Sequence, residues 1–439
     1  MLDRRQLILG ASAALAASSA GALPPKGRFV RATGTRFVSD GKPYRVAGTN
    51  MWYAAYLGAD PPFGNRDRLK RELDRLSALG VNNVRILGSS EFSPLKNSVR
   101  PTFRNRTSTF NKTLLRGLDH ALAEMGRRDI TAVLYLTNFW EWSGGMMTYL
   151  YWTNGGHYIN MNDPAHPWPE FADMSSEFYG HAAAVRMFDD YVRAVVGRRN
   201  TVTGRFYRDD PTILSWQLAN EPRPAGSDEA GRKHMKAYLA WVDGTARLIK
   251  SIDPNHMVST GSEGTQGCLN DSQCVVEAHG SPPIDYLTAH VWPQNWSWAD
   301  PGDLAGTWPT VERNSQSYIM QQVAIARRLK KPLLIEEFGF PRDGGSFDPG
   351  TLTTFKDRFY QLVYSAVLDS VRSGGPLQGS NFWGWGGEGR SRHQDHHFVR
   401  GDTSYVSDPP HEPQGWYSVF DVDASTQAVI RNYASAVKA

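Results

Sequence analysis

The sequence predicts a single (β/α)8 barrel, and three observations support that prediction. The composition of the 439-residue chain is that of a globular protein, with 40% hydrophobic and 21% charged residues. Short apolar runs alternate eight times with longer amphipathic segments, which fits a barrel better than a doubly wound sheet. No glycine-rich phosphate-binding loop follows the first predicted strand, so a dinucleotide-binding fold is disfavoured.

Eight short runs are predicted to form the barrel strands. The central runs are apolar on both faces, as is typical of parallel strands that are covered by helices. The predicted strands span residues 45–51, 83–87, 130–136, 213–218, 257–260, 286–291, 332–336 and 381–385.

The amphipathic segments between these runs are predicted to be the covering helices. In the first of them, Leu69, Leu73 and Leu76 fall on one face, and Gly80 is a natural C-terminal stop. The predicted helices span residues 66–79, 113–128, 183–199, 229–251, 315–329, 352–373 and 424–438.

Additional segments are expected at both ends of the barrel. Before the first strand, residues 29–30 and 37–41 indicate a β-hairpin that turns at Asp40 and Gly41, and we expect it to plug the barrel floor. Long strand-to-helix loops are predicted after strands three, five, six and eight, on the face where barrels build active sites. These loops span residues 137–180, 261–285, 292–309 and 386–423.

The N-terminus has the pattern of an export signal. Arg4 and Arg5 precede an apolar, alanine-rich stretch, and small residues at 20–22 form a cleavage site. Adjacent arginines are typical of a bacterial twin-arginine signal; an ordinary secretory signal or an uncleaved anchor is the alternative. We therefore expect a signal over residues 1–22, one domain over residues 23–439, and a periplasmic or secreted product.

Charge and hydropathy argue against two classes of partner, nucleic acids and membranes. The net charge is +4 and the basic residues are scattered, which argues against nucleic-acid binding. No apolar stretch after the signal is long enough to span a bilayer, so no membrane association is expected.

Cys268 and Cys274 can close a small loop in an oxidising compartment, or remain free thiols. The oligomeric state is left open.

Two glutamates lie at the carboxyl ends of predicted strands that are nearly opposite each other in the barrel. Glu221 follows the fourth strand and Glu337 follows the seventh, so both should reach one cleft. Glycoside hydrolysis needs such a pair, because one carboxyl protonates the leaving oxygen and the other attacks the anomeric carbon. Since adjacent strand residues face opposite ways, only one of Glu336 and Glu337 can enter the cleft, and periodicity does not say which.

Motifs along nearly the whole chain strengthen this interpretation. They include Asn220-Glu221-Pro222, Glu337-Phe338-Gly339, Asn83-Val84-Arg85, Thr137-Asn138, His290-Val291-Trp292, and the stretches 48–53 and 381–387. In this order and spacing the set resembles glycoside hydrolase family 5 of clan A, in its β-mannanase and β-mannosidase branch. The resemblance implies retaining hydrolysis of β-1,4-mannosidic bonds inside mannan chains, without a metal ion or organic cofactor.

The resemblance also assigns roles to residues. Glu221 is implied to be the acid/base, and the match to Glu-Phe-Gly selects Glu337 over Glu336 as the nucleophile. Trp292 departs from the family pattern, which places a tyrosine there whose hydroxyl contacts the nucleophile. The implied substrate-binding residues are Trp52, Arg85, Asn138, Asn220, His290, Trp292, Trp383 and Trp385.

Three alternatives to an endo-acting mannanase stay open from the sequence. The long loop at 386–423 could close one end of the cleft, which would make the enzyme an exo-acting β-mannosidase on manno-oligosaccharides. The same fold could act on β-1,4-glucan. A barrel that binds carbohydrate without cleaving it is the non-enzymatic alternative.

Overall fold

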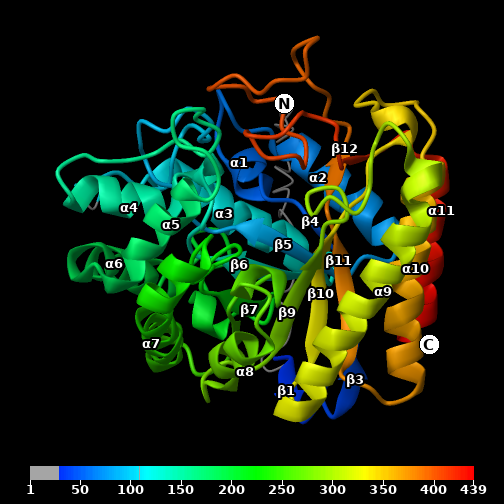
Figure 1. The fold of residues 1–439 in the computed structure, drawn as a ribbon, viewed down its shortest axis with the longest axis horizontal. Helices are drawn as coiled ribbons and strands as arrows, with labels where there is room; N and C mark the ends of the chain where they lie inside the picture. Colours follow the sequence, from blue (N-terminus) through cyan, green and yellow to red (C-terminus); the bar gives the residue numbers. More distant parts are fainter. Residues whose placement is uncertain (1–28, 108) are drawn as a thin grey trace, which may run out of the picture.

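The computed structural model describes residues 29–107 and 109–439, and these form the predicted barrel (Figure 1). Eight parallel strands lie in the order β8-β7-β6-β5-β4-β11-β10-β9, and Asp285 N donates to Val258 O (2.8 Å) where β9 returns to β8. The strands are β4 (Val46–Asn50), β5 (Asn83–Leu87), β6 (Thr131–Tyr135), β7 (Ile213–Gln217), β8 (Met257–Ser259), β9 (Leu287–Val291), β10 (Leu333–Phe338) and β11 (Leu377–Phe382).

The prediction was wrong in position for the last barrel strand. β11 begins at Leu377, whereas Trp385 belongs to a separate strand, β12 (Trp385–Gly387), which pairs with β13 (Val419–Phe420). The interior of β11 is polar although it is fully buried, so it lacks an apolar run. A Cβ at Gly379 would lie 2.3 Å from Val46 O, which explains the glycine at this close approach of two strands.

Long helices surround the barrel close to the predicted positions. Side chains of Asn65, Asn111, Ser227 and Asp303 accept hydrogen bonds from first-turn N–H groups and so begin four of them. These helices are α2 (Arg66–Ala78), α3 (Lys112–Gly126), α6 (Ala182–Val196), α7 (Asp228–Ile252), α9 (Leu304–Leu329), α10 (Thr354–Arg372) and α11 (Ala424–Lys438).

Several helical segments were not predicted. α9 starts at Leu304 rather than at residue 315, and it contains Pro309, which hid its first turns in the sequence. Four short helices lie in the connections: α1 (Ala54–Gly58), α4 (Gly145–Thr153), α5 (Glu170–Ser176) and α8 (Ser272–Gly280). Within the described residues, every helix is too short or too polar to cross a membrane.

A three-stranded antiparallel sheet closes the lower end of the barrel in Figure 1. It consists of β1 (Arg31–Thr33), β2 (Arg36–Ser39) and β3 (Lys42–Tyr44), so the predicted hairpin has one further strand. Asp40 and Gly41 have φ values of 50° and 73°, as a two-residue hairpin turn requires. Phe37 and Val30 pack into a buried cluster with barrel residues. This sheet is the predicted plug of the floor.

The two cysteines are both buried and free, so the predicted bridge is not formed in this structure. A hydrogen bond with Cys274 and burial raise the pKa of the Cys268 thiol well above its ordinary value. A thiol that stays protonated is a poor nucleophile for disulfide formation. The predicted export signal lies outside the described residues.

Candidate active site

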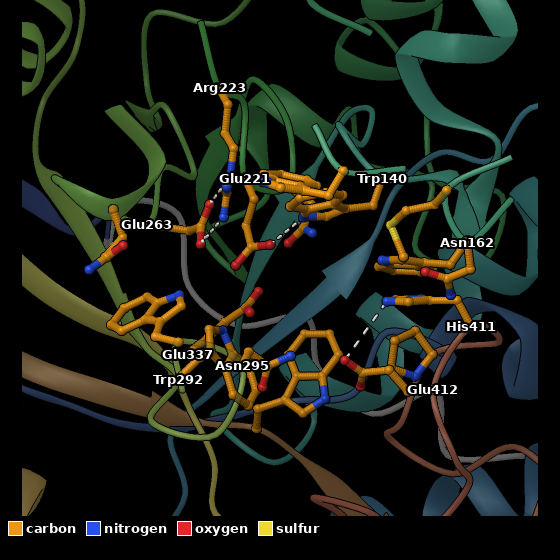
Figure 2. Close-up of a pocket in the computed structure, with 18 of the residues that line it drawn as sticks. Trp140, Asn162, Glu221, Arg223, Glu263, Trp292, Asn295, Glu337, His411 and Glu412 are labelled. Atoms are coloured by element: carbon orange, nitrogen blue, oxygen red, sulfur yellow. Dashed lines mark hydrogen bonds and ion pairs between the residues drawn. The ribbon is translucent and has the colours of Figure 1, made fainter. Parts of the chain in front are cut away.

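A cavity of about 820 Å³ opens at the carboxyl ends of the barrel strands and contains both predicted glutamates. Figure 2 shows Glu221, from the segment after β7, and Glu337, on β10, pointing into its centre. The cavity walls come from the loops that follow β6, β7, β8, β9 and β11, as expected for a barrel enzyme.

Glu221 is held by backbone contacts beyond the end of β7. Asn220 N donates to Thr137 O (2.8 Å) and Glu221 N donates to Gly261 O (2.9 Å), so this segment stays tied to both neighbouring connections. Glu221 has a φ of 51°, in the left-handed region, which costs a non-glycine residue roughly 1–3 kcal/mol and is found preferentially at functional sites.

Glu337 and Glu336 are adjacent on β10 but face different surroundings. Glu337 lines the cavity, whereas Glu336 is fully buried and does not line it. The register between β10 and β9 shifts between Ile335 and Glu337, where the regular alternation of the strand is interrupted.

Arg85 on β5 is the buried cation at the centre of the site. Its Nη1 donates to Glu337 Oε1 and to Asn50 Oδ1 (3.2 Å), and its Nη2 donates to Asn220 Oδ1 (2.8 Å). Its Nε donates to Gln217 Oε1 (2.7 Å). Every arm of the guanidinium is therefore engaged, which fixes Glu337 and Asn220 relative to each other.

His290 on β9 lies between the two cavity glutamates. Its Nδ1 is 2.5 Å from Glu221 Oε1 and 3.3 Å from Glu337 Oε2. One side-chain atom from each of the three residues lies within 4.8 Å of the others. That spacing would also suit a metal ion, but the guanidinium of Arg85 against Glu337 disfavours a second cation.

Three further residues surround Glu221, and none of them was assigned a catalytic or binding role from the sequence. Trp140 Nε1 donates to Glu221 Oε2 (2.5 Å), and the Arg223 guanidinium lies 4.8 Å from the centre of the Trp140 ring. Glu263 accepts from Arg223 through both oxygens, at 2.6 and 2.7 Å (Figure 2). Arg223 lies only two residues beyond Glu221, and this closeness was the available signal.

Both cavity carboxyls have raised pKa values. Burial raises the pKa of Glu221, and burial together with the charge of Glu221 raises the pKa of Glu337 well above its ordinary value. Burial lowers the pKa of His290 well below its ordinary value, so its ring is neutral. Arg85 opposes the shift on both carboxyls, and the N–H groups of Trp140 and Trp292 favour the charged form of Glu221.

The other predicted site residues divide into two groups. Asn220, Trp292 and Trp383 line the cavity. Arg85, Asn138 and His290 are fully buried behind it and act on their neighbours. Asn138 Oδ1, for example, accepts from Asn220 Nδ2 (3.2 Å) and from Trp140 N (3.0 Å).

The prediction of substrate contacts is wrong for Trp52 and Trp385. Both are buried outside the cavity lining. Trp52 Nε1 donates to Ser407 O (3.0 Å), and Trp385 Nε1 donates to Glu72 Oε2 (2.9 Å). The prediction failed because a motif match does not reveal the direction of a side chain. The indoles of Trp52 and Trp385 instead stabilise the base of the loop that follows β11.

Trp292 stands where the family pattern has a tyrosine. Its ring centre lies 6.0 Å from that of Trp383 and 4.9 Å from that of Tyr417. Its N–H favours the charged form of Glu221, so it supports the glutamate that follows β7 and not Glu337.

Comparison with known proteins identifies the family. A profile described as "GH family 5 beta-mannosidase-like" matches residues 27–439. The chain belongs to this branch of glycoside hydrolase family 5. It is therefore a glycoside hydrolase, and the alternative of a non-catalytic barrel loses its support.

Individual relatives agree with the family assignment. A putative mannan endo-1,4-beta-mannosidase 9 of Oryza sativa subsp. japonica is 31% identical over 369 residues, which cover 81% of each chain. Mannan endo-1,4-beta-mannosidase 1 of Arabidopsis thaliana is 31% identical over 368 residues, with the same coverage. A solved family 5 mannosidase from Rhizomucor miehei is 34% identical, with a TM-score of 0.85 over 94% of this chain and 98% of its own.

Proposed function

We propose that the enzyme hydrolyses β-1,4-mannosidic bonds with retention of configuration, with Glu337 as nucleophile and Glu221 as acid/base. The supporting observation is that one oxygen of each carboxyl lies within 4.8 Å of the other at the cavity surface. Retaining glycosidases hold their carboxyl groups about 5–5.5 Å apart, whereas inverting enzymes leave about 6.5–9.5 Å for a water molecule.

The hydrogen-bond partners favour this division of roles. Glu337 Oε1 accepts from Arg85, which keeps its proton in proteins, so this oxygen must remain unprotonated. Glu221, by contrast, accepts no hydrogen bond from a cation among the described residues: its Oε1 lies 2.5 Å from Nδ1 of the neutral His290, and its Oε2 accepts from Trp140. Glu221 is therefore the carboxyl that can hold the proton to be donated.

The reaction then follows in two balanced steps. Glu337 forms a bond to the anomeric carbon while the glycosidic C–O bond breaks and Glu221 gives its proton to the departing oxygen. Glu221 next takes a proton from water, whose oxygen displaces Glu337 and releases the sugar. Asn220 donates one N–H to Asn138, which leaves its second N–H for a sugar hydroxyl. Trp383 offers an apolar face to the ring that is cleaved.

A mannoside substrate is favoured by the relatives. The two plant relatives are described as mannan endo-1,4-beta-mannosidases, and the Rhizomucor miehei mannosidase has been solved in complex with mannosyl-fructose. Activity on locust-bean gum and manno-oligosaccharides is expected to exceed activity on carboxymethyl-cellulose. The reverse order would favour the β-glucanase alternative.

Cleavage at a chain end is the mode that the cavity walls favour. Asn162, from the loop after β6, and His411 with Glu412, from the loop after β11, line the same end of the cavity (Figure 2). An end that is walled by two loops leaves little room for a continuing polysaccharide chain.

Hydrogen bonds to neighbouring loops on two sides hold the loop after β11 in place at this end of the cavity. Arg400 Nη2 donates to Leu95 O (2.5 Å), and Lys96 N donates to Asn160 Oδ1 (3.0 Å), so the loops after β11, β5 and β6 are linked. On the other side, Tyr417 OH donates to Asn295 Oδ1 (2.5 Å) in the loop after β9.

Endo cleavage is the second candidate mode, because the plant relatives are described as endo-acting. Products from mannohexaose separate the two modes. Mannose and mannopentaose from the earliest times support cleavage at the chain end, whereas mixed dimers, trimers and tetramers support endo action.

Variants test the two catalytic roles. Glu337→Gln is expected to abolish turnover of aryl β-mannosides. Glu221→Ala is expected to retain formation of the glycosyl-enzyme from aryl substrates with good leaving groups, and azide should trap that intermediate as the β-mannosyl azide. Glu277→Gln, at an exposed position on α8, is the matched control and should behave as the wild type. Full activity of Glu337→Gln would refute the assignment.

We also propose that residues 1–22 are a twin-arginine export signal for the domain at 23–439. The paired Arg4 and Arg5 before an apolar stretch support this proposal. Replacing both arginines by lysine should retain the enzyme in the cytoplasm of a bacterial host with this pathway, whereas export that continues unchanged would indicate an ordinary secretory signal.

A further inference from the structure

Glu336 lies beside the predicted nucleophile, on the same strand, without reaching the cavity. Its side chain is fully buried, and its Oε2 is 3.6 Å from Arg85 Nε. The same guanidinium donates to Glu337 through Nη1. One buried cation therefore faces two carboxyl groups from successive residues of β10.

Gln217 on β7 connects Arg85 to Glu336, and its orientation follows from donor and acceptor chemistry. Arg85 Nε can only donate, so the atom 2.7 Å from it must be the amide oxygen of Gln217. The amide nitrogen then faces Ser259 Oγ (3.0 Å) and Glu336 Oε2. Glu336 Oε2 must therefore accept a hydrogen bond.

The second oxygen of Glu336 also favours the ionised carboxylate over the protonated form. Among the described residues, none forms a hydrogen bond with Glu336 Oε1. A proton on that oxygen would be a buried donor without an acceptor, which is costly. Burial raises the pKa of Glu336, but the two groups that contact this carboxyl, Arg85 and Gln217, are donors that oppose the shift and stabilise the ionised form.

We propose that Glu336 is a positioning residue. It is an ionised counter-charge to Arg85, and it thereby weakens the electrostatic attraction between Arg85 and Glu337. This inference rests on the proposed role of Glu337 as nucleophile. Glu336 also remains as an ionised partner of Arg85 when Glu337 becomes an uncharged ester in the glycosyl-enzyme. Glu336 thus helps to set the pH at which Glu337 becomes ionised without touching the substrate.

The other groups around the pair do not provide this counter-charge. Tyr135 on β6 lies over Arg85, with the guanidinium 4.4 Å from its ring centre, and burial raises its pKa well above the ordinary value. Burial also raises the pKa of Tyr286, so both phenols are neutral, as is His290 on β9. The charge of Glu263 is paired with Arg223. Glu221 faces Glu337 from the cavity side.

The test is the pH dependence of kcat/KM for Glu336→Gln. Removing a negative charge beside Glu337 lowers the pKa of Glu337, so the acidic limb of the profile should move to lower pH by about one unit. Glu336→Met removes the same charge without an amide and should shift the limb in the same direction. Glu336→Asp keeps the charge and should leave the limb near that of the wild type.

A control separates charge from hydrogen bonding. Ser259→Ala removes one acceptor of Gln217 and no charge, so it should leave the acidic limb in place. An unmoved limb in the folded Glu336→Gln or Glu336→Met enzyme, or an equal shift in Ser259→Ala, would overturn the inference. The profiles are read on whichever aryl β-glycoside the wild type cleaves, so a failure of the proposed mannoside specificity is a separate result.

Discussion

Replacing Arg85 by methionine should destabilise the protein in a pH-dependent manner. The side chain is fully buried and donates to acceptors from β4, β7, β10 and the segment after β7. Methionine fills much of the same volume but leaves Glu336 and Glu337 buried without their cation. Breaking a buried ion pair on one side costs about 3–5 kcal/mol.

The sign of the pH dependence follows from the two orphaned carboxyls. Without Arg85, burial holds their folded-state pKa values further above the unfolded value of about 4.3. A raised folded-state pKa contributes stability below the unfolded pKa, and this contribution is lost as the pH rises. The difference in unfolding free energy between wild type and Arg85→Met should therefore be small at pH 4 and approach its full value at pH 8.

Urea denaturation at pH 4, 6 and 8 measures this difference directly. Arg85→Lys keeps a positive charge without the planar fork, so it should show a weaker pH dependence than Arg85→Met. An equal loss of unfolding free energy at all three pH values would refute the electrostatic reasoning and indicate that Arg85 contributes by packing alone.

Three other measurements test separate features. Trp140→Phe removes the N–H that favours charged Glu221, so the alkaline limb of kcat/KM should move to higher pH; an unchanged limb would contradict the contact. Gly48→Ala places a Cβ 2.1 Å from Asn381 Oδ1 and should lower the unfolding free energy by about 1–3 kcal/mol in urea titrations, unlike Gly244→Ala, where the space is open. A thiol reagent should find no reactive cysteine in the native enzyme and two after unfolding; none after unfolding would reveal a bridge.

The barrel could be predicted from the sequence because most of its strands are apolar on both faces. β11 was misplaced because its interior residues are polar, and they are satisfied only by neighbours far away in the chain. Asn381 Nδ2, for instance, donates to Asn83 Oδ1 (3.0 Å). Such pairing is not visible as periodicity, so a buried polar strand looks like a loop.

The site was predictable to the extent that its residues belong to motifs. Glu221, Glu337 and Arg85 meet as expected, because strand ends converge in a barrel. The sequence did not indicate the contribution of Glu263 or Glu412, since each lies in a long connection whose path depends on tertiary contacts.

The loop after β11 has a built-in boundary. β12 and β13 pair with each other at its base, so the intervening residues 388–418 leave and return at nearly the same place. The segment 388–418, which narrows the cavity, is thus closed at its base by a strand pair and is structurally separate from the strands that hold the reacting groups. Exchanging this one stretch, in a laboratory or during descent, offers a route to reshape one end of the cleft while the reacting groups stay in place.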